Sequence, residues 1–334
     1  MTSFGDDVTQ FDLTRRPRRL RGSGHLRDMV RENHLRRDDL IMPLFIAHGQ
    51  GIRREIPSMP DIYQYSLDEL DRELDALSEA GIFRLILFGI PPQKDAVGSD
   101  AFSDGGIIQR AISHIRDYDE RFYLITDVCF CEYTDHGHCG VLREDGTLHN
   151  DATLKNLQKQ ALSHAEAGAD MLAPSGMIDG MIRAMREALD EADRSDLPIM
   201  SYAVKYASAF YGPFRDAVDS SPQSGDRRAY QMDPANAREA RVEARLDVEE
   251  GADLLMVKPA LSYLDIVRDI RDQFDLPLAC YNVSGEYSMV KAAAAKGWVD
   301  ETAIAIEKLL SMKRAGADLI LTYFARDIAS HLDS

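Results

Sequence analysis

Short apolar runs recur along the chain, and stretches with helical periodicity separate them. The runs are rich in Leu, Ile, Val and aromatic residues without clean alternation, which is typical of parallel strands buried on both faces. We expect eight strands, at Leu40–Ile46, Phe83–Phe88, Phe122–Asp127, Met171–Pro174, Ile199–Val204, Leu254–Val257, Leu278–Val283 and Leu319–Tyr323. Helical periodicity is found at Ser66–Ala80, Thr153–Ala167, Met181–Ala192, Ala235–Glu250 and Thr302–Arg314.

A weak internal repeat supports this alternation. Glu166–Asp170, Glu250–Asp253 and Arg314–Asp318 all end in Gly-Ala-Asp, and Glu79–Gly81 shares the first part of the pattern. Each segment closes a helix at a glycine, which adopts the left-handed conformation without strain. Eight strands alternating with helices predict an α/β protein with a (β/α)₈ TIM barrel. The competing fold is an open doubly wound sheet, which the lack of a Gly-x-Gly-x-x-Gly turn after the first strand disfavours.

Charge is distributed unevenly between the two ends of the chain. Residues 15–37 are strongly basic, although the 334-residue chain carries a formal charge of −17. We expect residues 1–36 to form an N-terminal arm for subunit contacts and residues 37–334 to form one catalytic barrel. The acidic remainder disfavours nucleic acid as a partner of the arm.

Composition excludes several other classes of protein. The sequence contains no run of about 18 apolar residues, so no membrane span is predicted. The first residues, Met1–Asp7, lack an apolar signal segment, which favours a cytoplasmic protein. The clustering of the cysteines favours reduced thiols and a metal over disulfides.

Three of the four cysteines, Cys129, Cys131 and Cys139, lie within eleven residues, directly after the predicted strand Phe122–Asp127. Zinc has four protein ligands where its role is structural, and three plus a water where it takes part in catalysis. Three thiolates therefore indicate an open, catalytic zinc site. A closed structural site with His136 or His138 as fourth ligand, and a loop without metal, remain as alternatives.

Two lysines end predicted strands of the barrel, Lys205 after Ile199–Val204 and Lys258 after Leu254–Val257. Active sites of such barrels lie at the carboxyl ends of the strands. Desolvation and a second nearby ammonium group both favour the neutral amine, which can attack a ketone to form a Schiff base. The alternative interpretation is a pair of ordinary surface or ion-paired lysines.

The longest irregular segment, Tyr206–Met232, follows the fifth predicted strand and is expected to be a lid or binding loop. It combines aromatic residues with arginines, which recognise carboxylates. The members concerned are Phe210, Tyr211, Phe214, Arg215, Arg227 and Arg228. These features together predict a Schiff-base enzyme that acts on a keto acid, with a solvated basic loop as the alternative reading of the lid.

Several long motifs in a fixed order resemble those of the porphobilinogen synthase (5-aminolevulinate dehydratase) family, from the basic arm at residues 16–21 to the end. They are TDVCFCEYTDHGHCG (126–140), APSGMIDG (173–180), FYGPFRDA (210–217), GDRRAYQ (225–231), MVKP (256–259) and YNVSGEY (281–287). The resemblance implies condensation of two 5-aminolevulinate molecules to porphobilinogen with loss of two waters, an early step of tetrapyrrole synthesis.

The resemblance also implies roles for individual residues. Lys258 matches the lysine that holds the first substrate, and Lys205 matches the lysine that holds the second. The substrate contacts implied are Ser284 and Tyr323 for the carboxylate of the first substrate, Arg215, Arg227 and Gln231 for the second substrate, and Asp127 and Ser175 near the reacting amine and carbonyl.

Metal use and assembly follow from the same resemblance. Cys129, Cys131 and Cys139 match the zinc-dependent form of the family, which leaves His136 and His138 as packing groups. Glu243 matches a glutamate that contacts an activating magnesium ion in some members. The basic arm matches one that embraces a neighbouring subunit, which implies a homo-octamer.

The sequence departs from the family pattern at two places. Ala260–Tyr263 reads Ala-Leu-Ser-Tyr where Gly-Met-Pro-Tyr is usual, and Asp135 stands where small polar residues are common. Two alternative functions remain at this stage: a class I aldolase-type lyase, which needs one Schiff-base lysine and no thiolate metal, and a non-catalytic scaffold stabilised by zinc.

Overall fold

Eight parallel strands form the barrel that the sequence predicts. The structure, a computed structural model, describes residues 13–220, 223 and 225–332. The strand order is β6-β5-β4-β1-β10-β9-β8-β7, and a parallel bridge between Leu172 and Ile199 brings the two ends together into a nearly closed barrel. The strands are β1 (Leu40–Ala47), β4 (Arg84–Ile90), β5 (Tyr123–Val128), β6 (Met171–Pro174), β7 (Met200–Lys205), β8 (Leu254–Lys258), β9 (Leu278–Asn282) and β10 (Leu319–Thr322). The predicted (β/α)₈ fold is therefore confirmed.

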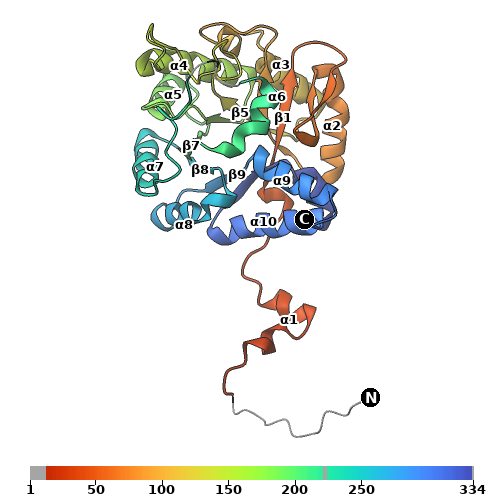
Figure 1. Cartoon of the computed structure of the whole chain (residues 1–334). Coiled ribbons are helices and arrows are strands. Elements are labelled where there is room, and N and C mark those ends of the chain that lie inside the picture. Colours follow the sequence, from red (N-terminus) through yellow and green to blue (C-terminus); the bar gives the residue numbers. More distant parts are fainter. Residues whose placement is uncertain (1–12, 221–222, 224, 333–334) are drawn as a thin grey trace, which may run out of the picture. The chain divides into compact units, whose positions relative to one another are not determined.

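Helices surround the strands of this barrel, as Figure 1 shows for α4, α5, α7, α8 and α10. Their bounds are α2 (Leu67–Ala80), α3 (Ile107–Tyr118), α4 (Asn150–Ala167), α5 (Met181–Glu191), α6 (Gly212–Val218), α7 (Arg238–Glu250), α8 (Leu264–Gln273), α9 (Ser284–Ala295), α10 (Glu301–Ala315) and α11 (Ala325–Ile328). Short 3₁₀ helices lie at Arg37–Asp39, Ser99–Phe102, Ala209–Tyr211, Leu261–Tyr263 and Ala329–His331. None of the helices in the described ranges combines the length and the apolar composition that crossing a bilayer requires.

The N-terminal residues form a small unit of their own, Met1–His34, next to the unit Leu35–Ser334. Its described part contains a 3₁₀ helix at Pro17–Arg21 and the short helix α1 (Gly24–Met29). The side chain of Ser23 caps α1 by accepting a hydrogen bond from the backbone N–H of Leu26. The first twelve residues of the predicted arm lie outside the described residues.

The internal repeat has a structural explanation at the base of the barrel. Its glycines end their helices with positive φ, at 98° for Gly168, 104° for Gly251 and 120° for Gly316. The aspartate two residues later then accepts a hydrogen bond from the backbone N–H at the start of the neighbouring strand. The pairs are Asp170 with Leu124, Asp253 with Ile199, and Asp318 with Leu278, at 2.7, 2.8 and 2.8 Å.

In each of these contacts the aspartate also pairs with an arginine, which lies on the helix that precedes the first strand of the pair. We call these contacts base clamps. The three arginines are Arg116 on α3, Arg186 on α5 and Arg271 on α8, and they pair with Asp170, Asp253 and Asp318 respectively. Each clamp thus joins one helix and two adjacent strands. The repeated aspartate therefore sets the register of strand pairs.

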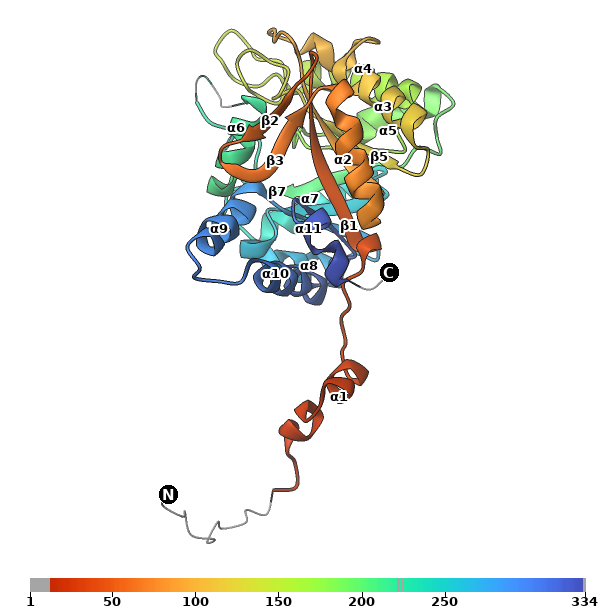
Figure 2. The ribbon, with the colours of Figure 1, turned by 90° about the vertical axis from the view of Figure 1, so that its right-hand side faces the viewer.

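A β-hairpin that the sequence analysis did not predict follows β1. It consists of β2 (Arg53–Ile56) and β3 (Met59–Tyr65), which pair in antiparallel fashion. β3 also pairs with the end of β1, where Phe45 lies opposite Gln64. Figure 2 shows the hairpin beside β1 on the α6 side of the barrel. Its strands escaped prediction because β2 is polar and mostly exposed, so no apolar run marks it.

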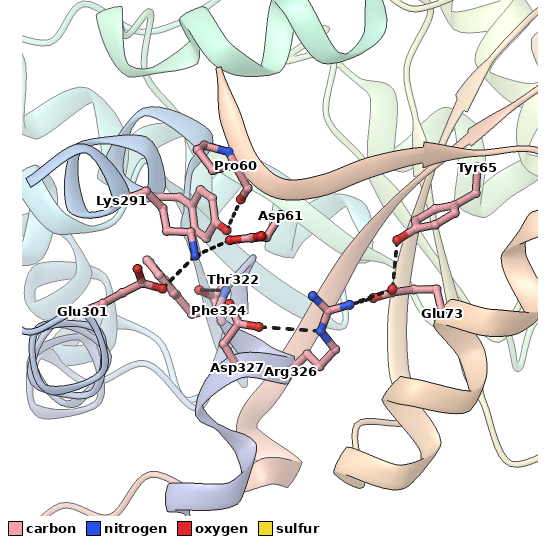
Figure 3. A network of polar contacts seen from close by, with 11 residues as sticks. Pro60, Asp61, Tyr65, Glu73, Lys291, Glu301, Thr322, Phe324, Arg326 and Asp327 are labelled. Atoms are coloured by element: carbon pink, nitrogen blue, oxygen red, sulfur yellow. Dashed lines mark hydrogen bonds and ion pairs between the residues drawn. The ribbon is translucent and has the colours of Figure 1, made fainter. Parts of the chain in front are cut away.

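A polar network fixes this hairpin to the helices next to it (Figure 3). The carboxylate of Glu73 on α2 accepts hydrogen bonds from the hydroxyl of Tyr65 at 2.8 Å and from Arg326 on α11 at 2.6 Å. On the other side, the ammonium group of Lys291 on α9 pairs with Asp61 and Glu301, each at 2.7 Å. The hairpin thus belongs to the rigid frame of the barrel mouth.

Candidate active site and metal-binding loop

The two predicted lysines lie side by side at the carboxyl ends of adjacent strands. Lys205 ends β7, Lys258 ends β8, and the two are register partners in the parallel sheet. Both are buried, with relative exposures of 4% and 5%. Burial of two amines at one strand end is unusual and is a feature of functional sites.

The ammonium group of Lys258 is surrounded by aromatic rings. Its Nζ lies 4.4 Å from the ring centre of Tyr281, 5.1 Å from that of Tyr202 and 5.2 Å from that of Phe214. Burial lowers the pKa of Lys258 to about 7, and the charge of Lys205 acts in the same direction. A substantial fraction of the Lys258 amine is therefore neutral at physiological pH.

Lys205 is held on the other side by polar groups from β5 and β6. Its Nζ donates a hydrogen bond to the carbonyl oxygen of Ser175, whose hydroxyl donates to Oδ2 of Asp127 at 3.1 Å. The second oxygen of Asp127 has no hydrogen-bond partner among the described residues. Burial raises the pKa of Asp127 well above its usual range, and the nearby Glu132 adds to this effect. The predicted pair Asp127 and Ser175 thus lies within reach of one amine.

The three predicted cysteine ligands converge on one point. The Sγ atoms of Cys129, Cys131 and Cys139 all lie within 4.8 Å of one another, all three residues are buried, and all are free thiols. Hydrogen bonds from Cys129 and Cys131 hold the pKa of Cys139 well below that of an ordinary thiol. Three facing sulfurs fit a soft divalent metal such as zinc.

The two histidines of the loop contact other groups. Nε2 of His136 lies 3.2 Å from the carbonyl oxygen of Ala96, and Nδ1 of His138 lies 3.1 Å from the hydroxyl of Tyr230. Within the part of the chain that the structure describes, the groups arranged to hold a metal contain neither histidine. A closed site with a histidine as fourth ligand is thus not supported, while Asp127 and Glu132 form a second possible group of ligands with Cys129.

The segment Tyr206–Met232 is more ordered than its prediction as an irregular loop. It contains the 3₁₀ helix Ala209–Tyr211 and the helix α6, and only Ser221, Pro222 and Ser224 lie outside the described residues. The prediction of an irregular segment is wrong for α6, because Pro213 near the start of that helix looks like a loop signal in the sequence although it suits a first helical turn.

Backbone hydrogen bonds tie both ends of this lid to the lysine strands. The N–H of Tyr206 donates to the carbonyl of Lys258 at 2.9 Å, and the N–H of Met232 donates to the carbonyl of Lys205 at 3.1 Å. Further along, the side chain of Lys94 donates to the carbonyl of Val218 at 3.1 Å. Both ends of the lid are therefore fixed to the two strands that carry the lysines.

A small cavity under the lid brings six of the predicted site residues together. They are Cys131, Ser175, Lys205, Arg215, Arg227 and Lys258. Phe88, Glu132, Tyr211 and Phe214 complete the lining. The cavity therefore unites the metal loop, both lysines and the lid arginines in one place.

Several buried polar atoms around this cavity have no hydrogen-bond partner within the described residues. They include Nε of Arg215, Nε of Arg227, both amide atoms of Gln231, Oδ1 of Asp127 and Oε2 of Glu132. Buried polar groups are nearly always paired, so this concentration indicates that the site is built for a polar ligand. Arg215 and Arg227 line this cavity, whereas the predicted Gln231 lines the neighbouring pocket that contains Glu239 and Glu243.

Ser284 and Tyr323 reach the cavity indirectly. The hydroxyl of Ser284 accepts a hydrogen bond from the N–H of Phe214 at 3.0 Å, and the hydroxyl of Tyr323 lies 2.9 Å from that of Tyr281. Phe214 and Tyr281 are both rings that face Lys258. Ser284 and Tyr323 therefore contact the immediate neighbours of that amine.

Glu243 lies apart from both lysines, on α7. It is half-buried and shares a pocket with Asp179 and Glu239. Burial raises the pKa of Glu243, and the negative charges of Asp179, Glu239 and Glu250 raise it further. This acidic pocket is a second location, separate from the lysine cavity.

Sequence reasoning missed the groups that complete the surroundings of the lysines. Tyr202 and Tyr281 lie within the predicted strands, where they look like ordinary core residues. Glu132 stands between two cysteine-loop residues, and burial raises its pKa to about 8. The sequence signal that could have identified Glu132 as a site residue is its position as a charged residue between buried ones.

We expect Gly285→Ala to weaken substrate binding, because a Cβ at this position would lie 2.5 Å from the carbonyl oxygen of Phe210 and would displace the lid. A rise in KM of about ten-fold is expected, since displacement of binding groups by about 1 Å can cost up to about 100-fold in rate. Steady-state kinetics would measure it. Gly105→Ala is the control, because no atom lies within 4 Å of its added Cβ. Equal kinetics for both variants would contradict the role given to lid contact.

Comparisons with known proteins agree with this arrangement. The family model described as delta-aminolevulinic acid dehydratase matches residues 14–331. A protein of that name from Halalkalibacterium halodurans is 58% identical over 323 residues, which are 96% of this chain and 98% of that protein. A protein of the same name from Bacillus subtilis is 55% identical over 317 residues, covering 95% of this chain and 98% of that protein.

A solved structure is similar over nearly the same length. The delta-aminolevulinic acid dehydratase (porphobilinogen synthase) of Toxoplasma gondii ME49, in complex with its reaction product porphobilinogen, superposes with a TM-score of 0.93 at 42% identity. The alignment covers 96% of this chain and 92% of that one. The likeness thus extends over the strands, the lid and the cysteine loop.

Proposed function

Because the chain belongs to the delta-aminolevulinic acid dehydratase (porphobilinogen synthase) family, and is thus an enzyme of early tetrapyrrole biosynthesis, we propose that it acts through Schiff bases on two lysines with the assistance of zinc. The substrates are two molecules of 5-aminolevulinate, and the products are porphobilinogen and two waters. The observation that carries this proposal is the pairing of Lys205 and Lys258 at adjacent strand ends beside three facing thiols.

Lys258 is the nucleophile for the first substrate. Its neutral amine attacks the ketone carbon, a C–N bond forms, and the ketone oxygen leaves as water, which gives an iminium ion. The rings of Tyr281, Tyr202 and Phe214 keep the amine dry and offer their faces to the cationic product. The same surroundings that lower the pKa of the amine therefore also accept the iminium.

Lys205 activates the second substrate in the same way. Its iminium draws electrons from the neighbouring C–H bond, and loss of that proton gives an enamine, the carbon nucleophile that joins the two substrates. Because both substrates are covalently held on register partners, their encounter becomes effectively intramolecular. Asp127, whose pKa burial raises, is placed to accept or return protons near this amine.

The lid arginines recognise the carboxylate of the second substrate. Arg215 and Arg227 present unpaired Nε atoms next to the cavity, and Gln231 presents an unpaired amide. Ser284 and Tyr323 bind the carboxylate of the first substrate, for which Ser284 exchanges its contact with Phe214.

Zinc is the metal we propose for Cys129, Cys131 and Cys139. When bound, it supplies a Lewis acid that polarises a carbonyl and lowers the pKa of water. The neighbouring guanidinium of Arg227 is suited to this loop: burial alone would lower its pKa, but the thiolates of Cys131 and Cys139 raise it overall.

Magnesium is a separate proposal for Glu243. The support is its half-buried carboxylate beside Asp179 and Glu239, since magnesium prefers oxygen ligands.

A cytoplasmic location, and a homo-octamer in which the basic arm contacts a neighbour, likewise stay predictions. For the octamer, the support is that Leu20, Met29 and Val30 of the arm are exposed apolar residues at 53%, 81% and 46%.

The two alternatives raised from the sequence find no support. A class I aldolase-type lyase needs neither a second lysine nor thiols, whereas both are assembled at one cavity. A non-catalytic scaffold is excluded by the membership of an enzyme family over residues 14–331.

We expect Lys258→Ala to lower kcat by at least about three orders of magnitude while fold and zinc content stay, because the amine acts covalently. Mass spectrometry after cyanoborohydride reduction with 5-aminolevulinate should place adducts on Lys258 in the unmodified protein. Lys159→Ala, an exposed lysine on α4, is the control. Undiminished turnover in the Lys258 variant would refute the mechanism.

The pH dependence of adduct formation should report the pKa of Lys258. Only the neutral amine reacts, and a pKa of about 7 means that its fraction rises through pH 7 and levels off above it. Initial trapping rates measured between pH 5.5 and pH 10 in zinc-loaded protein, a range chosen to bracket the expected and ordinary lysine values of about 7 and 10.4, would show this. A midpoint near that of an ordinary lysine would contradict the neutral amine.

Cys131→Ala should reduce zinc content and activity together, with a loss of zinc affinity of more than about 100-fold because a direct ligand is removed. Atomic absorption and turnover on the same preparation would test this. The control is Cys280→Ala, which removes a buried cysteine outside the cluster. A Cys131 variant that is free of zinc and fully active would rule out the metal assignment.

A further inference from the structure

A carboxylate with no place in the proposed chemistry is completely buried behind the active site. Glu286 lies in the first turn of α9 with a relative exposure of 0%. Its Oε1 accepts a hydrogen bond from the N–H of Leu261 at 2.8 Å, and its Oε2 accepts from Nδ2 of Asn282 at 2.7 Å and from the N–H of Val283 at 3.1 Å. Burying a carboxylate is costly, and three donors are what make it tolerable.

The donors come from the backbone segments that carry substrate-binding groups. Leu261 follows Lys258 by three residues, in the loop after β8. Asn282 ends β9, and Val283 directly precedes Ser284. One carboxylate therefore connects the segment after the first lysine with the segment before Ser284.

The connection extends to the third strand end. Oδ1 of Asn282 accepts a hydrogen bond from the hydroxyl of Thr322 at 3.0 Å, and that hydroxyl accepts one from the N–H of Phe324 at 3.2 Å. Thr322 ends β10, and Thr322 and Phe324, both labelled in Figure 3, flank Tyr323 in the sequence. We call Glu286, Asn282 and Thr322 the strand-end clamp.

A buried cation balances the charge of this clamp. Lys308 on α10 donates from Nζ to the backbone carbonyl of Glu286 at 3.2 Å and lies 4.6 Å from the ring centre of Phe324. Glu286 also sits at the N-terminus of α9, where the helix dipole favours a negative charge. Lys308 thus holds the backbone of Glu286 from one further element, α10.

We propose that Glu286 is a positioning residue for the reaction, which fixes Lys258, Ser284 and Tyr323 relative to one another. The inference rests on the proposed function, since it assumes that these three residues hold the first substrate. Glu286 acts only through the segments that it joins. Because the groups that contact its carboxylate oxygens are all donors, an amide in its place keeps the volume and loses one acceptor, which weakens the link between the loop after β8 and the end of β9.

Glu286→Gln tests this in the zinc-loaded full chain. We expect unchanged far-UV circular dichroism and zinc content, a KM for 5-aminolevulinate about ten-fold higher, and a much smaller change in kcat, as small displacements of binding groups have effects of roughly this size. The substrate concentration that half-saturates the cyanoborohydride adduct on Lys258 should rise by the same factor. A purely structural residue would lower the melting temperature without moving that concentration.

Glu73→Gln is the matched control. Glu73 is also buried, at 5%, and its carboxylate is held by Tyr65 and Arg326 away from the strand ends (Figure 3). We expect Glu73→Gln to lower the melting temperature and to leave unchanged the substrate concentration that half-saturates the adduct on Lys258. The proposal is overturned if Glu286→Gln also leaves the half-saturating substrate concentration unchanged, or if both variants raise that concentration by the same factor.

Two further results separate the possible outcomes. If Glu286→Gln does not fold, Thr322→Val replaces it, since valine keeps the shape and removes only the hydroxyl of the clamp; normal kinetics in that variant overturn the proposal. If the unmodified protein forms no adduct on Lys258, the proposed function fails. An adduct in the unmodified protein, with unchanged half-saturation in the variants, refutes the clamp alone.

Discussion

The burial of two amines at neighbouring strand ends is the constraint on which the rest of the site depends. Lys205 and Lys258 are register partners in a parallel sheet, so their separation is set by the backbone rather than by flexible side chains. Two ammonium groups that close cannot both keep a full charge without water. The rings around Lys258 and the carbonyl of Ser175 at Lys205 divide the roles between the two lysines. The two amines thus have different surroundings.

Acidic groups lie near this concentration of amines and guanidinium groups. Burial raises the pKa values of Asp127 and Glu132, whereas Arg227 donates a hydrogen bond to the carbonyl of Gly137 in the cysteine loop at 2.8 Å. Burial lowers the pKa of Arg215, and Arg227 lowers it further. An anion beside Arg215 would offset both effects, whereas the thiols of the cysteine loop already raise the pKa of Arg227.

Much of this arrangement could be predicted from the sequence. The eight apolar runs coincide with barrel strands, and the positions of the lysines after those runs placed them at the mouth. The hairpin β2–β3 could not be predicted, because its register is fixed by contacts with β1 and with Glu73 and Arg326, which are distant in sequence. The clustering of Glu286 with Leu261 and Thr322 likewise depends on the barrel having closed.

The base clamps divide the barrel into blocks of consecutive helices and strands. Each block runs from an arginine-bearing helix to the second strand that its clamp joins: α3 to β6, α5 to β8, and α8 to β10. In the fourth block the two charges are exchanged in position: the arginine, Arg84, starts the second strand, β4, and its partner Asp38 lies before the first strand, β1. Both lysines are carried by the block from α5 to β8, the three clustered cysteines lie in the block from α3 to β6, and Ser284 lies in the block from α8 to β10. The cysteine loop, the amine pair and Ser284 thus lie in three successive blocks, so the predicted site is complete only when all three blocks have come together.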